Sequence, residues 1–205
     1  MTRKADSANE AEVVPSVPAA TAHESASLSA PAHVPSLSPI ERAAAAAKEG
    51  HVEFAESQRG ATFNKLFGSY VAGAKHITLK DPYIRLPYQI RNLAEFLETV
   101  FTYTDRSDEV HVHLITGCDE EYADRQIDNL SQVQATFGTL GITLTYEFSD
   151  TGHDRSIVTD TGWRVMLGRG LDIYQRYSDN DWLNPLTRQQ KLRRVKEFSV
   201  VYQRR

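Results

Sequence analysis

The sequence contains a single cysteine, only two tryptophans and no long hydrophobic run. Because Cys118 stands alone, the chain can form neither an internal disulfide nor a zinc cluster of cysteines, and we expect a reducing, cytoplasmic environment. No apolar stretch approaches the roughly 20 residues that a membrane-spanning helix needs. The N-terminus, Met1-Thr2-Arg3-Lys4, is not followed by the apolar segment of a signal peptide. These absences predict a soluble protein without a transmembrane segment.

An excess of positive charge is also lacking. The 23 basic and 27 acidic residues give a formal net charge of -4, which argues against non-specific binding of nucleic acid by the protein as a whole. Only a local basic patch could attract phosphates, and the C-terminal region offers one candidate run. That run consists of Arg188, Lys191, Arg193, Arg194 and Lys196, followed by Arg204 and Arg205.

Motifs for cofactors and metals are scarce as well. The chain lacks the glycine-rich Walker loop of nucleotide-binding ATPases, and we expect no cofactor. His111 and His113 lie two residues apart on a predicted strand and would share one face, but no third ligand accompanies them. We therefore predict no metal site.

The chain divides into three parts by composition. Residues 1–38 are rich in alanine, serine, proline and glutamate and almost free of aromatic residues, which predicts a disordered tail. Ser38-Pro39-Ile40-Glu41 has the pattern of a capping box with proline at the first helical position. Alanines follow, so we expect a linker helix within residues 39–60. Residues 61–205 should form one domain.

Hydrophobic spacing within that domain alternates between helix and strand. The spacing predicts helices over 63–71, 86–101 and 119–137, and strands over 76–80, 109–115 and 142–148. This order favours right-handed crossovers and a parallel sheet with helices packed against it. The segments 155–158 and 163–167 flank a turn and predict a hairpin, and 197–202 should form a last strand. The fold class is therefore α/β, a mostly parallel sheet with an antiparallel hairpin extension.

The strongest candidate for chemistry is the stretch from 153 to 172. It contains His153, Arg155 and Asp160, and it resembles the phospholipase D superfamily motif of His-x-Lys with an aspartate five residues after the lysine. In that family the histidine is the nucleophile, the lysine holds phosphate oxygens, and two copies of the motif meet at one site. The resemblance therefore implies that a chain with one copy would need to dimerise.

Arginine replaces the lysine of that motif at position 155. Arginine can clamp a phosphate bidentately, but it is not interchangeable with lysine. We therefore favour a site that binds phosphate without turning it over. A phosphodiesterase or nuclease that uses His153 remains an alternative, as does a surface histidine beside a solvated arginine.

A second resemblance covers more of the chain. The motifs Asp81-Pro82-Tyr83-Ile84-Arg85 and Gly168-Arg169-Gly170-Leu171-Asp172 occur in order with His113 and His153 between them. Over roughly residues 64–177 the chain resembles the phospholipase D-like C-terminal domain of MIT-domain proteins. That resemblance implies a dimeric, non-catalytic module that binds membranes of acidic phospholipid. Because residues 1–60 leave no room for a three-helix MIT domain, the ESCRT-III partners of that domain are not expected here.

The same segment is also similar to the C-terminal region of bacterial Lon-like AAA+ proteins, including those of BREX-type phage-defence systems. That similarity implies an accessory domain that acts beside an AAA+ partner. We keep it as a third possibility, next to the binding module and the phosphodiesterase.

Three further residues complete the predicted ligand site. Asp81 follows a strand directly, at the end where parallel sheets place their sites. Arg85 could bind an anion there or form an ion pair with Asp81, and Arg169 could bind phosphate or pair with Asp172. We expect Asp81, Arg85, His153, Arg155 and Arg169 to hold a ligand. The ligand would be a phosphate of acidic lipid or nucleic acid, or a protein partner.

Overall fold

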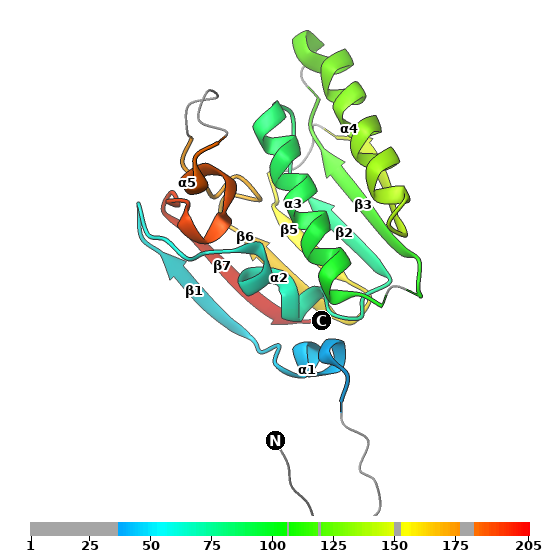
Figure 1. Cartoon of the computed structure of the whole chain (residues 1–205), viewed down its shortest axis with the longest axis vertical. Helices are drawn as coiled ribbons and strands as arrows, with labels where there is room; N and C mark the ends of the chain where they lie inside the picture. Colours follow the sequence, from blue (N-terminus) through cyan, green and yellow to red (C-terminus); the bar gives the residue numbers. More distant parts are fainter. Residues whose placement is uncertain (1–36, 106, 119, 150–152, 177–182) are drawn as a thin grey trace, which may run out of the picture. The chain divides into compact units, whose positions relative to one another are not determined.

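A seven-stranded mixed sheet forms the centre of the computed structural model, with strand order β1-β7-β6-β5-β2-β3-β4 (Figure 1). The structure describes residues 37–105, 107–118, 120–149, 153–176 and 183–205. The predicted disordered tail, residues 1–38, lies outside the described residues except for its last two positions. The α/β class predicted from the sequence is confirmed.

One half of the sheet is parallel, as predicted. Its strands are β2 (His76–Lys80), β3 (Val110–Thr116) and β4 (Ile142–Phe148), paired in that order. The crossover helices are α3 (Pro87–Tyr103) and α4 (Ala123–Gly138), the latter preceded by a short 3-10 turn, η1 (Glu120–Tyr122). The expected alternation of strand and helix is therefore present, with boundaries shifted by a few residues.

The other half is antiparallel and is larger than a hairpin. It contains β5 (Ser156–Thr159) and β6 (Trp163–Leu167), which form the predicted hairpin, and β7 (Phe198–Arg204), the predicted last strand. Between β6 and β7 the chain forms two short turns, α5 (Pro185–Arg188) and η3 (Gln190–Leu192). β5 pairs antiparallel with β2 and thereby joins the two halves.

Residues 39–60 differ from the single linker helix that the sequence predicted. The helix α1 spans only Pro39–Ala45, with the expected capping box between Ser38 and Glu41. Gly50–Phe54 then forms β1, which pairs antiparallel with β7 at one edge of the sheet. The Phe54 ring stacks on Phe198 with centroids 4.6 Å apart. This long-range pairing, rather than any local periodicity, makes the segment a strand.

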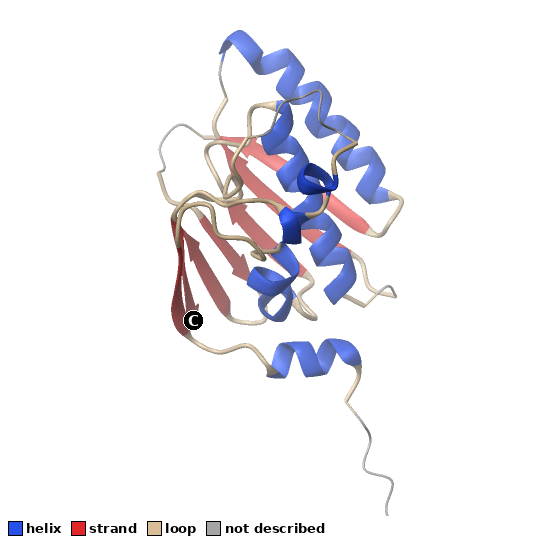
Figure 2. Ribbon diagram, turned by 60° about the vertical axis from the view of Figure 1, so that its left-hand side comes forward, coloured by secondary structure: helices blue, strands red, loops and turns tan. Residues whose placement is uncertain are grey.

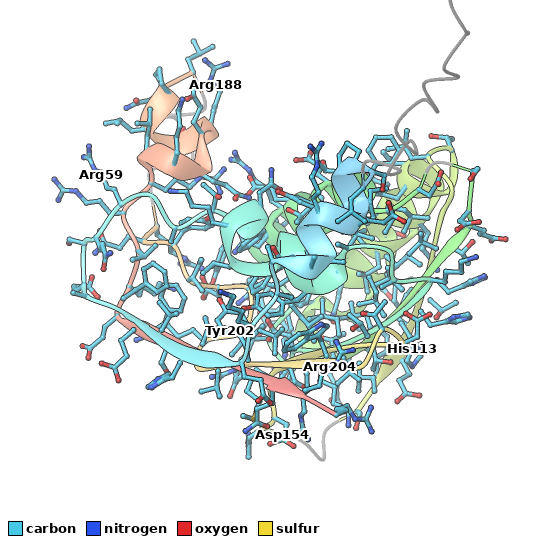
Figure 3. All side chains as sticks on the ribbon, turned by 90° about the horizontal axis from the view of Figure 1, so that it is seen from below. Arg59, His113, Asp154, Arg188, Tyr202 and Arg204 are labelled. Atoms are coloured by element: carbon cyan, nitrogen blue, oxygen red, sulfur yellow. The ribbon has the colours of Figure 1, made fainter. Side chains whose placement is uncertain are left out.

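All the main helices pack on one face of the sheet (Figure 2). α2 (Phe63–Val71), α3 and α4 bury their apolar stripes against the strand residues that point toward them. Viewed from below, His113 and Asp154 project from the opposite side of the sheet (Figure 3). Among the described residues, no helix covers that side, which we call the open face. None of the described helices is long and apolar enough to cross a membrane.

The buried stripe of α4 differs from its prediction at one position. Ile127 was expected in the core but is 38% exposed, and Gln126 is fully buried instead. The Gln126 side-chain amide donates hydrogen bonds to the carbonyls of Ile84 (2.8 Å) and Gly117 (2.9 Å). α4 therefore supports the loop after β2 through a polar contact that a hydrophobic pattern does not register.

Candidate functional site

Several loops meet at one end of the strands, where β2, β6 and β1 end and β5 and β7 begin. The strand register establishes this, because Lys80 lies opposite Ser156, Ser156 opposite Met166, and Phe54 opposite Phe198. The loops after β2 and β6 carry the two sequence motifs, residues 81–85 and 168–172. The structure thus brings together two segments that lie about ninety residues apart in sequence.

Asp81 joins these two loops. Its side chain is 1% exposed, and its carboxylate accepts hydrogen bonds from the backbone N–H of Leu171 (2.8 Å) and of Tyr83 (3.1 Å). Burial raises the pKa of Asp81 to about 6, against the opposing effects of these hydrogen bonds and of the nearby Arg155 charge. Gly170 adopts a φ of +63°, and a side chain there would overlap the carboxylate. Asp81 therefore holds the site together.

Arg155 lies just before β5, in reach of both loops. Its Nη1 donates to the carbonyl oxygen of Gly168 at 2.6 Å, and its guanidinium carbon lies 4.5 Å from the centroid of the Tyr83 ring. The Nε of Arg155 is buried and has no hydrogen-bond partner among the described residues. The Arg155 guanidinium is thus positioned by one hydrogen bond and by a cation–π contact with Tyr83, and its Nε–H can still donate a hydrogen bond.

The two ion pairs considered from the sequence are not formed. Arg85 donates its Nε to the carbonyl of Pro82 (3.0 Å) and makes no salt bridge with Asp81. Arg169 donates its Nε to the backbone carbonyl of Glu197 (2.7 Å). The carboxylate of Asp172 instead pairs with Lys196 at 2.9 Å. Both arginines are therefore positioned by carbonyl oxygens, which leave their charge uncompensated by these aspartates.

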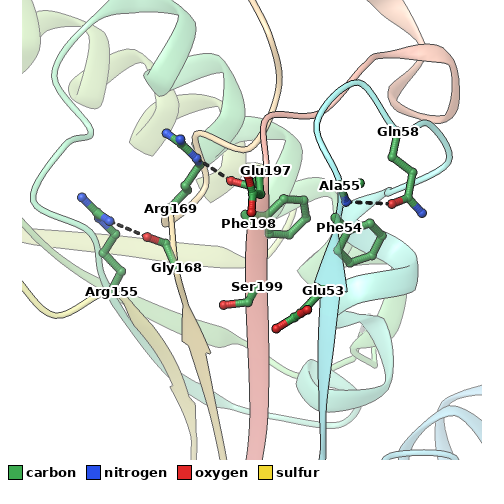
Figure 4. A pocket seen from close by; sticks show the side chains of 10 residues that line it. All are labelled: Glu53, Phe54, Ala55, Gln58, Arg155, Gly168, Arg169, Glu197, Phe198 and Ser199. Atoms are coloured by element: carbon green, nitrogen blue, oxygen red, sulfur yellow. Dashed lines mark hydrogen bonds between the residues drawn. The ribbon is translucent and has the colours of Figure 1, made fainter.

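An open groove of about 730 Å³ lies beside these arginines. The residues that line it are Glu53, Phe54, Ala55, Gln58, Arg155, Gly168, Arg169, Glu197, Phe198 and Ser199 (Figure 4). Arg155 and Arg169 extend to one side of β6, and the side chains of Ser199 and Glu53 point toward that same side. The groove therefore has Arg155 and Arg169 at one end and Glu53 at the other, and Glu197 lies beside Arg169 (Figure 4).

The residues of the predicted catalytic motif are not brought together. His153 is exposed in the loop before β5, and Arg155 also precedes that strand in the sequence. Asp160 follows the other end of β5, five residues or roughly 16 Å from Arg155 along an extended strand. There its carboxylate accepts hydrogen bonds from the backbone N–H of Lys75 (3.2 Å) and of His76 (3.1 Å). Asp160 thus ties β5 to the start of β2.

The basic C-terminal run is partly internal. Arg193 is buried and forms a two-pronged ion pair with Glu95 of α3, at 2.7 and 2.5 Å. Lys196 is the partner of Asp172. These two cations therefore support the fold, and they do not contribute to an exposed basic patch.

The histidines considered as metal ligands lie on the open face. His113 contacts the Thr145 hydroxyl at 2.9 Å, and the His111 ring stacks on that of His76, with centroids 5.3 Å apart. In the part of the chain that the structure describes, no three His, Cys, Asp or Glu residues are grouped as a metal site would require.

Sequence reasoning missed the carboxylate end of the groove. Glu53 lies on β1, which the sequence pattern did not predict, and Glu197 precedes β7. Neither residue belongs to a motif, and only the pairing of β1 with β7 brings Glu53 to the site. The alternation of Val52, Glu53 and Phe54 is the one signal that could have indicated a strand there.

Comparisons with known proteins identify the family of this domain. A family model described as "Phospholipase D-like domain at C-terminus of MIT" matches residues 60–204. MIT domain-containing protein 1 of Mus musculus is 27% identical over 126 residues, which are 61% of this chain and 50% of that protein. The chain thus aligns with about half the length of this curated relative. The family match covers both loop motifs and the arginines beside the groove, and the chain belongs to the family of phospholipase D-like domains found at the C-terminus of MIT.

Proposed function

We propose that this domain is a non-catalytic binding module that recognises single phosphate groups, such as those presented at the surface of a membrane that contains acidic lipid. The observation that carries the proposal is the pair Arg155 and Arg169 beside one open groove, next to the two loops that Asp81 joins. Guanidinium groups bind phosphate oxygens through charge-assisted hydrogen bonds. The buried, unpartnered Nε of Arg155 leaves further capacity for a ligand.

Binding without catalysis is favoured by the position of His153. A nucleophilic histidine needs a partner that orients its ring and stabilises its charged form. The exposed His153 makes no side-chain hydrogen bond or ion pair that the structure describes, and Asp160 is engaged at the far end of β5. A second copy of the chain would have to complete the motif, and the dimer implied by the family resemblance stays a prediction.

A small phosphate headgroup fits the groove better than nucleic acid. A nucleic-acid strand carries a continuous row of negative charges, whereas Glu53 and Glu197 line the groove only a strand or two away from the arginines. These carboxylates would repel the phosphates that flank the bound one. An isolated headgroup does not meet this repulsion. The predicted link to a Lon-like AAA+ partner also stays a prediction.

The experiment is co-sedimentation with phosphatidylcholine vesicles that either contain or lack phosphatidic acid. Arg169→Gln should weaken binding to the anionic vesicles by roughly tenfold, the effect of one charged hydrogen bond. Arg125→Gln is the matched control, because it removes the same charge from an exposed position on α4, across the sheet from the groove. Equal binding by the two variants, or binding that does not weaken with salt, would exclude the proposal.

Two further measurements separate the alternatives. Hydrolysis of a generic phosphodiester that is abolished by His153→Ala would establish an enzyme and replace the binding module. Tighter binding to single-stranded DNA than to anionic vesicles would show that the phosphates belong to nucleic acid.

A further inference from the structure

Four residues form a row across the ends of the antiparallel strands. Arg155 donates to the Gly168 carbonyl, the N–H of Gly168 donates to the Ser199 carbonyl at 3.0 Å, and Ser199 lies opposite Glu53 in the register of β7 and β1. The row therefore runs from a guanidinium, over a glycine and a hydroxyl, to a carboxylate. Opposite charges occupy its two ends.

The centre of this row is open because residue 168 is glycine. A Cβ at this position would lie 3.3 Å from the Ser199 carbonyl oxygen and 3.4 Å from its hydroxyl, tighter than ordinary van der Waals contact. A larger residue would fill the space between the arginines and Ser199. The absence of a side chain at Gly168 thus leaves space in which a ligand could contact both ends of the row.

The carboxylate end is held in place by the backbone around it. Phe54 stacks on Phe198, Glu56 accepts a hydrogen bond from the N–H of Glu197 at 2.8 Å, and Gln58 accepts one from Val195 at 2.9 Å. These contacts fix the chain after Glu53, and the pairing of Gly50–Val52 with β7 fixes it before Glu53. These contacts fix where the Glu53 side chain begins.

The Glu53 side chain itself is accessible. It is 78% exposed, and its neighbour on the same strand face is His51, whose Nε2 lies 3.7 Å from the carboxylate. Glu53 also lies before the residues that the family model matches, 60–204. Glu53 is thus supplied to the groove by β1, outside the matched residues.

We propose that the groove takes a phosphate ester that also carries an ammonium group, as in 2-aminoethyl phosphate, with its phosphate at Arg155 and Arg169 and its ammonium at Glu53. This inference rests on the proposed function and names the ligand class of the same site. Neighbouring strands are about 4.8 Å apart, so β6 and β1 are separated by about 10 Å across β7. With one hydrogen bond of about 3 Å at each end, that span leaves room for a short linker between the charges. The Ser199 hydroxyl lies between them.

The experiment compares two ligands that differ only by the ammonium group. Calorimetric titration of the full chain with 2-aminoethyl phosphate and with ethyl phosphate should show a preference of roughly threefold to fivefold for the first, because Glu53 is exposed and its ion pair is screened. Glu53→Gln should abolish that preference. Glu147→Gln is the matched control, since it removes an exposed carboxylate from β4 at the opposite edge of the sheet, and it should keep the preference.

The outcomes separate this inference from the function on which it rests. Equal affinity of the wild-type chain for both ligands, or a preference that survives in Glu53→Gln, overturns the inference and leaves phosphate binding intact. No binding of either ligand, together with no response to phosphatidic acid vesicles, removes the proposed function as well.

A vesicle experiment identifies the source of the ligand. Phosphatidylethanolamine and phosphatidylcholine carry the same charges, but the choline nitrogen has no N–H to donate to a carboxylate. Binding to phosphatidylethanolamine vesicles above that to phosphatidylcholine, dependent on Glu53, supports a lipid headgroup. Preference for 2-aminoethyl phosphate without preference for these vesicles supports a small soluble ester.

Discussion

Replacement of Gly170 by alanine tests whether the Asp81 carboxylate joins the two loop motifs as the structure describes. Gly170 has a φ of +63°, and its missing side chain leaves the space that the Asp81 carboxylate occupies. An alanine methyl group there would overlap both carboxylate oxygens. The carboxylate would have to move away from the N–H of Leu171, to which it is bonded at 2.8 Å.

Two effects make up the expected cost. A non-glycine residue in the left-handed region costs about 1–2 kcal/mol. Displacing Asp81 leaves a buried N–H and a buried carboxylate without their hydrogen bond, which costs about 1–3 kcal/mol more. Gly170→Ala should therefore lower the free energy of unfolding by about 2–5 kcal/mol, measured by urea denaturation followed by circular dichroism.

Gly162→Ala is the matched control. Gly162 also has a positive φ, +87°, but the nearest atoms that its Cβ would meet lie 3.9 Å away, so only the backbone effect should appear. In an Asp81→Ala background the overlap is gone, and Gly170→Ala should then cost no more than Gly162→Ala. If Gly170→Ala costs the same with and without the Asp81 carboxylate, within about 0.5 kcal/mol, the proposed contact does not exist.

Three more predictions concern buried polar groups. Because burial raises the pKa of Asp81 from 3.8 to about 6, the neutral form is favoured on folding. The free energy of unfolding of the wild type, relative to that of Asp81→Asn, should therefore fall by about 3 kcal/mol as the pH rises from about 4 to 6. A relative increase of the wild type's calorimetric melting temperature over that pH range would contradict the sign. Arg193→Met should destabilise the fold by about 1.5–3 kcal/mol in urea, since it removes the charged hydrogen bonds to the Glu95 carboxylate, which keeps Arg91 and Gln190 as partners, and the double variant with Glu95→Gln should recover part of that loss. Gln126→Leu should lower the free energy of unfolding in urea by about 1–3 kcal/mol for each of the two loop carbonyls that lose their hydrogen bond. Gln132→Leu on the exposed face of α4 should change it little.

Much of the fold could be predicted because its signals are local. The stripes of α2 and α3 and the apolar runs of β3 and β4 specify their own elements, and the segments around residues 156–167 specify a hairpin. β1 could not be predicted in this way, because four exposed residues and the half-buried Phe54 become a strand only when β7 pairs with them. Local propensity carries no information about a partner 150 residues away.

The candidate site divides along the same line. Asp81, Arg155 and Arg169 could be chosen from residue type and motif spacing, and the structure places them at the same end of the strands. Their partners could not be predicted. The sequence suggested ion pairs of Asp81 with Arg85 and of Asp172 with Arg169, and neither is formed. Asp81 is bonded instead to backbone N–H groups of the opposite loop, and Lys196 pairs with Asp172. Such choices depend on which groups the tertiary fold buries together.

The distribution of charge at the site is what the proposed phosphate binding depends on, because the protein as a whole is acidic. Lys196 compensates Asp172, whereas the buried Asp81 has a pKa of about 6 and faces the Arg155 charge. Arg155 and Arg169 are held by backbone carbonyls, which orient a guanidinium without cancelling its charge. The carboxylate of Glu53 lies beyond Ser199, at the far end of the groove. The proposed binding module should therefore accept a ligand that places negative charge at one end only and reject a polyanion that would extend over Glu53.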